Sequence, residues 1–353
     1  MMTTEAAVAQ TTLPTEQFVQ DVLDTIERER EREIISRRYG LFDRKETLEQ
    51  IGELLGITRE RVRQLEKSVV ARLKADGSKL PHIAEVQAAL SETLTENGQL
   101  ARISALSGEL TAENTKTDQA RIAFLATLCP DLTVIDENDF YFQAVGITKA
   151  RNEAAIKLST DKLIAVIKKI GEPTDIETIA KEAKIAEVAQ AEALARISKQ
   201  LATLNGLWGL IKWPMVNPKN IRDKIYVILK ENGKHMHFNE IAKAIKDSDF
   251  KRKDVTTQAI HNELIKDKRF VLIGRGIYAL KEWGYKKGTV ADIITEVLRK
   301  AGEPLHRDEI VKRVLKSRYV KETTILLNLQ GKPQFKRVAK ATYTLAEPAP
   351  ATS

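Results

Sequence analysis

The chain has 353 residues, a formal net charge of +8, 30% charged side chains and only 5% aromatic ones. This length allows two or more domains, and the composition is typical of a helix-rich protein with several small cores. No apolar run reaches the roughly 18 residues that a membrane span needs, and the single cysteine, Cys129, excludes an intramolecular disulfide and a cysteine-based zinc site.

Residues 1–26 are expected to form a tail and a lead-in helix, with residues 1–15 disordered. The opening sequence MMTTEAAVAQTTLPTEQ has neither the basic nor the apolar segment of a signal peptide. We therefore expect a cytoplasmic location and no membrane contact.

The next segment, 27–76, has the pattern of a helix-turn-helix. Thr47 is expected to cap a helix whose apolar residues recur at helical spacing, and Gly56 supplies the turn. Thr58 then caps a second helix, in which Val62, Leu65 and Val69 share one side. The opposite side carries a mixed polar set: Arg59, Glu60, Arg63, Gln64 and Lys67. Such a mixture suits the edges of bases in the major groove, although an ordinary solvated face would look the same.

Two stretches, EREIISRRYGL and TLEQIGELLGITRERVRQLEK, carry a resemblance. From 31 to 74 the chain closely resembles the region-four helix-turn-helix of primary-type bacterial sigma factors. The resemblance implies that the second helix recognises the −35 promoter element of double-stranded DNA. By motif position, the resemblance implies that base edges are contacted by Arg59, Glu60 and Gln64. It implies that phosphates are contacted by Thr47, Arg61, Arg63 and Lys67. It implies that the flap of core RNA polymerase is faced by Arg37, Arg38, Tyr39 and Leu41.

The resemblance covers about an eighth of the chain, and nothing here resembles the aromatic-rich region with which a full sigma factor opens a promoter. We therefore do not expect this chain to melt a promoter by itself.

The rest of the sequence contains a repeat. The segments 163–181, 225–243 and 293–312 each read as a helix, a glycine turn and a second helix, and 83–106 is a weaker copy. Gly171, Gly233 and Gly302 are expected at helix C-caps, where φ is positive. Each copy ends in a short β-like segment with a central aromatic residue: Tyr141, Trp208, Tyr278 and Tyr343.

Three helices followed by a β-hairpin describe a winged helix. The predicted fold is therefore mainly α with small β-wings, an N-terminal helix-turn-helix plus tandem winged-helix units. The expected units are 81–148, 155–213, 219–285 and 289–345, followed by a disordered tail, 346–353.

Charge separates these units. Residues 81–148 hold 3 Lys/Arg and 10 Asp/Glu, which makes this unit a poor DNA ligand. It could pack on neighbouring units, meet a basic protein surface, or keep the helix-turn-helix from binding nonspecifically. Residues 219–345 hold 29 Lys/Arg and 15 Asp/Glu, which suits a polyanion such as nucleic acid, or a solvated lysine-rich surface.

The segment 219–285 resembles a HARE-type winged helix, similar to the N-terminal domain of the RNA polymerase delta subunit, and 289–345 looks like a divergent sister copy. The third helix of 219–285 should run over about 256–266 and expose some of Thr257, Gln258, His261 and Asn262. Phosphate contacts are expected from these residues: Lys251, Arg252, Lys253 and Arg275, and in the last unit Lys316, Arg318, Lys336, Arg337 and Lys340.

His237 and His306 recur at matching positions before a helix, which indicates capping or packing rather than metal binding. Cys129 is expected to be a buried small residue. We expect no metal and no cofactor.

The leading hypothesis is a sigma-like DNA-binding transcription protein of the bacterial cytoplasm and nucleoid, acting with RNA polymerase. The alternative is a delta-like polymerase accessory subunit that uses the same modules to dock on protein. A nuclease is a third option, but no paired carboxylates in a strand-rich context, glycine-rich phosphate loop or nucleophile–histidine arrangement supports an enzyme. No oligomeric state follows from these patterns.

Overall fold

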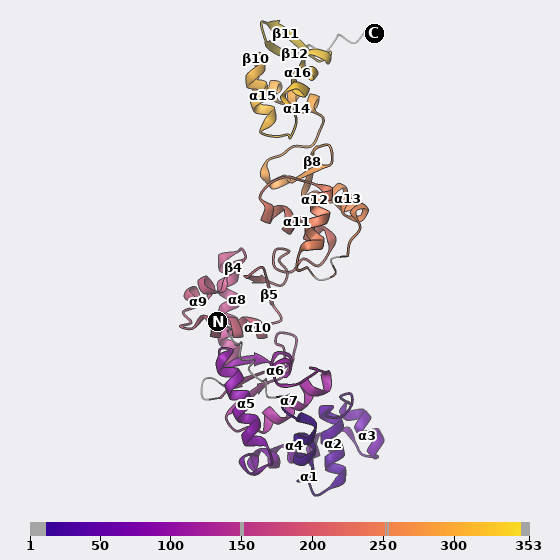
Figure 1. Cartoon of the computed structure of the whole chain (residues 1–353), viewed down its shortest axis with the longest axis vertical. Coiled ribbons are helices and arrows are strands. Elements are labelled where there is room, and N and C mark those ends of the chain that lie inside the picture. Colours follow the sequence, from indigo (N-terminus) through magenta and orange to yellow (C-terminus); the bar gives the residue numbers. More distant parts are fainter. Residues whose placement is uncertain (1–11, 149–151, 251, 253, 347–353) are drawn as a thin grey trace, which may run out of the picture. The chain divides into compact units, whose positions relative to one another are not determined.

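The computed structural model describes residues 12–148, 152–250, 252 and 254–346 (Figure 1). The chain divides into two units, Met1–Lys212 and Trp213–Ser353. In the described residues it is mainly helical, with four small three-stranded antiparallel sheets, as predicted for the fold class. No helix in these ranges is both long and apolar enough to cross a membrane.

The N-terminal unit begins with helices and one short 3-10 turn: α1 (Thr15–Asp24), α2 (Glu29–Tyr39), α3 (Leu48–Leu55), α4 (Arg59–Ala75) and η1 (Gly77–Lys79). The predicted caps are confirmed. The Thr47 hydroxyl accepts from the Gln50 amide in a capping box at the start of α3, and the Thr58 hydroxyl accepts from the Arg61 amide at the start of α4. Gly56 joins the two helices in the left-handed conformation, with φ of 63°.

Four repeated units follow, each with three helices and three strands. The first contains α5 (Ile83–Glu96), β1 (Leu100–Arg102), α6 (Ile103–Leu110), α7 (Lys116–Leu128), β2 (Leu132–Ile135) and β3 (Ala144–Ile147). The second contains α8 (Glu153–Ile170), β4 (Thr174–Asp175), α9 (Ile176–Ala183), α10 (Val188–Ile197), β5 (Leu201–Leu204) and β6 (Leu207–Leu210).

The C-terminal unit holds the other two copies. The third contains α11 (Ile221–Asn232), β7 (Met236–His237), α12 (Phe238–Asp247), α13 (Thr257–Lys266), β8 (Phe270–Gly274), β9 (Ile277–Leu280) and the turn η2 (Lys281–Trp283). The fourth contains α14 (Val290–Ala301), β10 (Leu305–His306), α15 (Arg307–Leu315), α16 (Glu322–Gly331), β11 (Phe335–Ala339) and β12 (Thr342–Leu345). In all four copies the last strand lies in the middle of its sheet and pairs antiparallel with the other two.

The expected glycine C-caps are confirmed at Gly171, Gly233 and Gly302, which all have positive φ. The aromatic residue of the last strand is confirmed for Trp208, Tyr278 and Tyr343, which lie in β6, β9 and β12. The prediction is wrong for Tyr141, which precedes β3 and forms an isolated bridge with Ser198. The Asn138 side chain accepts from the Phe140 and Tyr141 amides, and this turn delays the strand.

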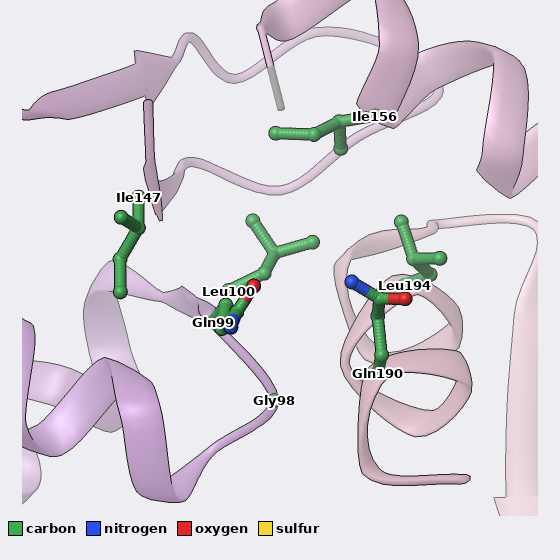
Figure 2. A pocket seen from close by; sticks show the side chains of 7 residues that line it. All are labelled: Gly98, Gln99, Leu100, Ile147, Ile156, Gln190 and Leu194. Atoms are coloured by element: carbon green, nitrogen blue, oxygen red, sulfur yellow. The ribbon is translucent and has the colours of Figure 1, made fainter. Parts of the chain in front are cut away.

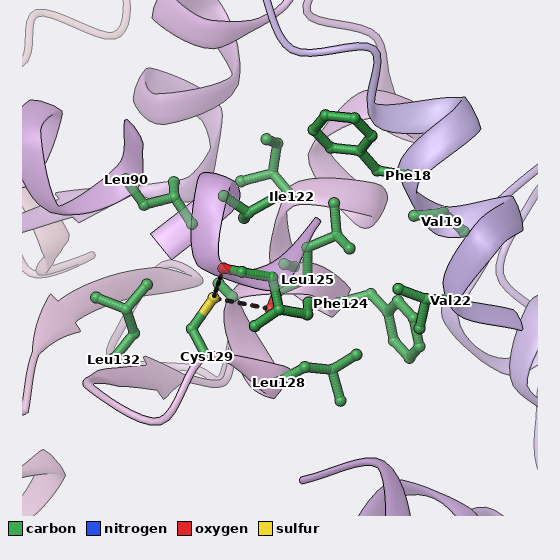
Figure 3. Packing of buried hydrophobic residues seen from close by; sticks show 14 of the residues in the cluster. Phe18, Val19, Val22, Leu90, Ile122, Phe124, Leu125, Leu128, Cys129 and Leu132 are labelled. Atoms are coloured by element: carbon green, nitrogen blue, oxygen red, sulfur yellow. Dashed lines mark hydrogen bonds between the residues drawn. The ribbon is translucent and has the colours of Figure 1, made fainter. Parts of the chain in front are cut away.

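One hydrophobic core joins the N-terminal helices to the first repeated unit (Figure 3). Phe18, Val19 and Val22 of α1 lie beside Phe124 and the neighbouring apolar residues of α7. Val69 and Leu73, in the second half of α4, belong to the same core. The second half of α4 and the first repeated unit therefore share one core.

Leu13 and Cys129 are members of this core. The prediction of disorder to residue 15 is wrong for Leu13, which is buried and whose amide donates to the Leu110 carbonyl; residues 1–11 lie outside the described residues, as do 347–353 of the predicted C-terminal tail. Cys129 is buried as expected, with Sγ 3.4 Å from the Leu125 carbonyl oxygen.

Candidate nucleic-acid interface

The first half of α4 is held by a small core of its own. Ile34 of α2, Ile51 of α3 and Val62 of α4 are fully buried against one another. Because Val62 faces inward, the other side of the helix faces solvent. The polar set predicted for that side is exposed: Arg59, Glu60, Arg63, Gln64 and Lys67. The expected amphipathic division of this helix is confirmed.

The exposed side chains of α4 bind one another in the free protein. The Glu60 carboxylate accepts from Arg63 Nε at 2.9 Å, from Arg63 Nη2 at 2.7 Å and from Gln64 Nε2 at 3.3 Å. Arg61 Nη1 donates to Gln64 Oε1 at 3.4 Å. The bidentate bond from Arg63 is the main reason that the pKa of Glu60 falls to about 2. Glu60 is thus a charged acceptor at neutral pH, and Arg59 is exposed on the same turn of the helix.

The residues expected near phosphates are placed as follows. Arg61 and Lys67 are exposed on α4, and Thr47 is exposed but uses its hydroxyl as a helix cap. Arg275 is exposed at the turn between β8 and β9. Arg252 is exposed, and its carbonyl accepts from Lys224 Nζ at 2.7 Å. Lys251 and Lys253 lie outside the described residues.

In the last unit, Lys316, Lys336, Arg337 and Lys340 are exposed. Arg318 is partly buried, and its Nη1 donates to the Leu272 carbonyl at 3.4 Å, so it joins the third and fourth units.

The residues expected to face a polymerase are partly engaged inside the fold. Arg37 pairs with Glu33 and Glu46, and Arg38 pairs with Glu66. Tyr39 lies edge-on to Phe124 with ring centroids 5.1 Å apart, and burial raises its pKa to about 12.

The docking prediction is wrong for Leu41, which is fully buried in the core shared with α7. The sequence around Leu41 gave no indication of this burial, because the core that holds Leu41 includes residues far away in the chain, and Arg121, which binds the Leu41 carbonyl, lies 80 positions later.

An open depression is lined by residues of α2 and α4, among them Arg63 and Lys67 of the exposed polar face. It has a volume of about 420 Å³ and is lined by Tyr39, Arg63, Glu66, Lys67, Val70, Ala71 and Lys74. The lining combines apolar side chains with three cations and one carboxylate, so it can contact both apolar and charged groups of a partner.

Sequence reasoning missed Arg121, which joins α7 to the helix-turn-helix. Its side chain is only 10% exposed. Nε donates to the Leu41 carbonyl at 2.8 Å, Nη2 to Glu16 at 2.6 Å and Nη1 to Asp118 at 3.4 Å. The available signal was the run that follows it, IAFLATL, because a helix that is apolar on all sides is buried on all sides.

The geometry of 29–75 defines a helix-turn-helix whose last helix, α4, has an exposed polar face. Residues 28–75 match the family model described as Sigma-70, region 4, which confirms the resemblance for this segment. The chain is also 46% identical over 57 residues to RNA polymerase sigma factor SigA from Bacillus sp, from Microcystis aeruginosa and from Synechocystis sp.. The match spans 16% of this chain and 15%, 14% and 13% of those relatives, so it describes the helix-turn-helix and not the whole protein.

Proposed function

We propose that this chain is a sigma-like DNA-binding transcription protein that reads a −35-like promoter element through α4 and acts with RNA polymerase in initiation or its regulation. One observation carries the proposal: the segment that matches region 4 of sigma factors presents an exposed mixed polar face on a helix fixed by a buried core.

The chemistry of that face supplies sequence choice. Arg59 can donate a bidentate pair to guanine, ionised Glu60 can accept from a cytosine amino group, and Gln64 can pair with adenine. Phosphate contacts from Arg61, Arg63 and Lys67, with Thr47 at the start of α3, add affinity that falls with salt. In the free protein the Arg63–Glu60 bond already orders these side chains, which lowers the entropy cost of binding. On binding, this bond is exchanged for contacts to DNA.

For the rest of the chain we propose four winged helices, at 81–148, 155–213, 219–285 and 289–345, the third of HARE type. The helix and strand order of the four repeated units supports this interpretation. We propose that the basic third and fourth units hold duplex DNA that flanks the element, with Arg275 and Arg337 among the phosphate contacts.

The proposal is tested by fluorescence anisotropy of the full chain on two duplexes, one with a −35-like element and one with that element scrambled. Arg59→Ala should cost roughly 1–3 kcal/mol on the first duplex and little on the second. Arg44→Ala is the matched control, because it removes the same exposed charge from a loop outside α4. If both variants weaken both duplexes equally, Arg59 does not read bases.

The depression at Tyr39 favours a second candidate, a delta-like polymerase accessory subunit that uses this surface for protein docking. Half-exposed Arg37, Arg38 and Tyr39 would then contact the polymerase. Copurification with core polymerase, together with equal affinity for the two duplexes, would support this candidate.

A further inference from the structure

The third helix of each repeated unit, directly before the β-hairpin, is the element that a helix-turn-helix places in the major groove. These helices are α7, α10, α13 and α16. They occupy the same position in the chain order of the four units. Their burial differs sharply, and this difference decides which of them can meet DNA.

Helix α7 is enclosed along its second half, whereas Lys116 at its start is exposed. Seven of its residues are buried: Arg121, Ile122, Ala123, Phe124, Leu125, Ala126 and Leu128. Figure 3 shows its side chains inside the core that α1 completes. With Arg121 bound to the Leu41 carbonyl, the second half of α7 supports the helix-turn-helix and cannot enter a groove while this core exists.

Helix α10 packs on the first repeated unit. Its buried residues are Ala191, Ala193, Leu194, Ala195 and Ile197, and the Ile197 carbonyl accepts from the Phe142 amide at 2.9 Å. A Cβ on Gly98, before β1, would lie 2.4 Å from the Ala189 carbonyl oxygen. The remaining cavity between these elements, lined by Leu100, Gln190 and Leu194 among others, is only about 10 Å³ (Figure 2). That is room for one water at most.

Helices α13 and α16 are open. Each buries only two residues, four positions apart: Ile260 and Leu264 in α13, and Ile325 and Leu329 in α16. This shared spacing aligns the two helices with an offset of 65 positions. Exposed Gln258 and Asn262 of α13 therefore correspond to exposed Thr323 and Leu327 of α16.

The two open faces differ in chemistry. On α13 the amide side chains of Gln258 and Asn262 lie one turn apart, and Gln258 Nε2 donates to Asn262 Oδ1 at 3.1 Å. Asn and Gln are the side chains that pair bidentately with adenine. On α16 the corresponding position holds Leu327, which is 67% exposed and has no hydrogen-bonding group.

Exposed cations lie close to α13 along the chain, together with Asp267, which is bound to Arg269. Lys266 ends the helix, Lys268 follows it, and Arg275 stands at the tip of the hairpin; all three are exposed. Glu263 is the one acidic residue of α13, and it is partly buried. Residues 219–345 carry 14 more basic than acidic side chains, so the surrounding surface is complementary to phosphate.

We propose that α13 is a second base-reading helix for duplex DNA, with Gln258 and Asn262 as its reading residues, and that α7 and α10 are internal supports that do not touch DNA. The inference rests on the proposed function and extends it, because the chain then recognises two DNA segments, one through α4 and one through α13.

The test is selection of duplexes from a randomised pool by the full chain, by Gln258→Ala/Asn262→Ala, and by Arg59→Ala. The matched control is Thr323→Ala/Leu327→Ala, which changes the corresponding exposed positions of α16. All of these positions are exposed, so the variants should keep the fold, as circular dichroism can verify.

We expect the unmodified chain and the α16 control to enrich two conserved segments. The α13 variant should lose one segment and bind the selected duplex about ten-fold or more weakly, while Arg59→Ala should lose the other. An unchanged consensus with the α13 variant would overturn this inference and leave the α4 proposal standing. If Arg59→Ala selected the same consensus as the unmodified chain, the α4 proposal would be contradicted instead.

Discussion

Glu60 and Arg63 show how single residues order the exposed polar face of α4. Both side chains are exposed, so their bond adds little to the stability of the fold. Its effect is to order three of the polar residues and to keep Glu60 ionised.

The Glu60 pKa offers a direct test of this arrangement. We expect a carboxyl-carbon NMR titration of the full chain to give a midpoint near 2, against the ordinary 4.5, because the Arg63 hydrogen bonds favour the charged form. Since the pKa is lowered by folding, the pairing is complete above about pH 4.5 and is lost as the pH falls toward 2. In Arg63→Ala the midpoint should return most of the way to 4.5. A Glu60 midpoint that does not respond to this change would show that the pair is not formed in solution.

Arg121 shows which contacts could not be predicted from a residue and its neighbours in the sequence. The helix caps at Thr47, Thr58, His237 and His306 follow from two or three neighbouring residues, and the structure confirms them. The bonds from Arg121 to Leu41 and Glu16 join positions 80 and 105 residues apart, and no local pattern encodes them. For the same reason the burial of Leu41 escaped prediction.

At the scale of elements, periodicity predicted helices and turns well but not their surroundings. The reader face of α4 was predictable because Val62, Leu65 and Val69 alone fix which side is inward. The burial of α10 was not, because it depends on a neighbour from another repeated unit. In α10 that neighbour is β1 of the preceding unit, reached through Gly98.

Gly98→Ala should loosen the contact between the first two repeated units. Gly98 has φ of +73°, and a Cβ there would require the backbone at Ala189 to move. Gly171→Ala is the matched control, because Gly171 has φ of +82° but nothing within 4 Å of the added atom. Both changes carry the left-handed strain of about 1–2 kcal/mol, and Gly98→Ala adds an overpacking cost of about 1–3 kcal/mol.

Hydrogen exchange of the full chain separates these two costs. Amides of α10 and β1 should exchange faster in Gly98→Ala and at the unmodified rate in Gly171→Ala, in which the change stays near the end of α8. Equal exchange of α10 in the two variants would mean that α10 does not pack on β1 as described.

At the scale of the whole molecule, the two units differ both in net charge and in how far the third helices of their repeated units are exposed. The N-terminal unit packs most of the third helices of its two repeated units against other elements, while α4 exposes a mixed polar face. The C-terminal unit leaves α13 and α16 open on a basic background. The net charge of the chain alone would suggest nonspecific DNA binding throughout, whereas our proposal confines DNA contact to the helix faces that burial leaves open.

The central claim, that α4 lies on a −35-like element, is tested most directly by cleavage of DNA from a probe on that helix. Ser68 is exposed on the same side of α4 as Glu60 and Gln64, so Ser68→Cys can carry an iron chelate. The native Cys129 is buried and its pKa is raised to about 12, so its thiol should not react.

We predict cleavage of a promoter duplex within or next to the −35-like element, and loss of this pattern when Arg59→Ala is combined with Ser68→Cys. Weak cleavage spread evenly along the duplex, or the same pattern with and without Arg59, would contradict the account.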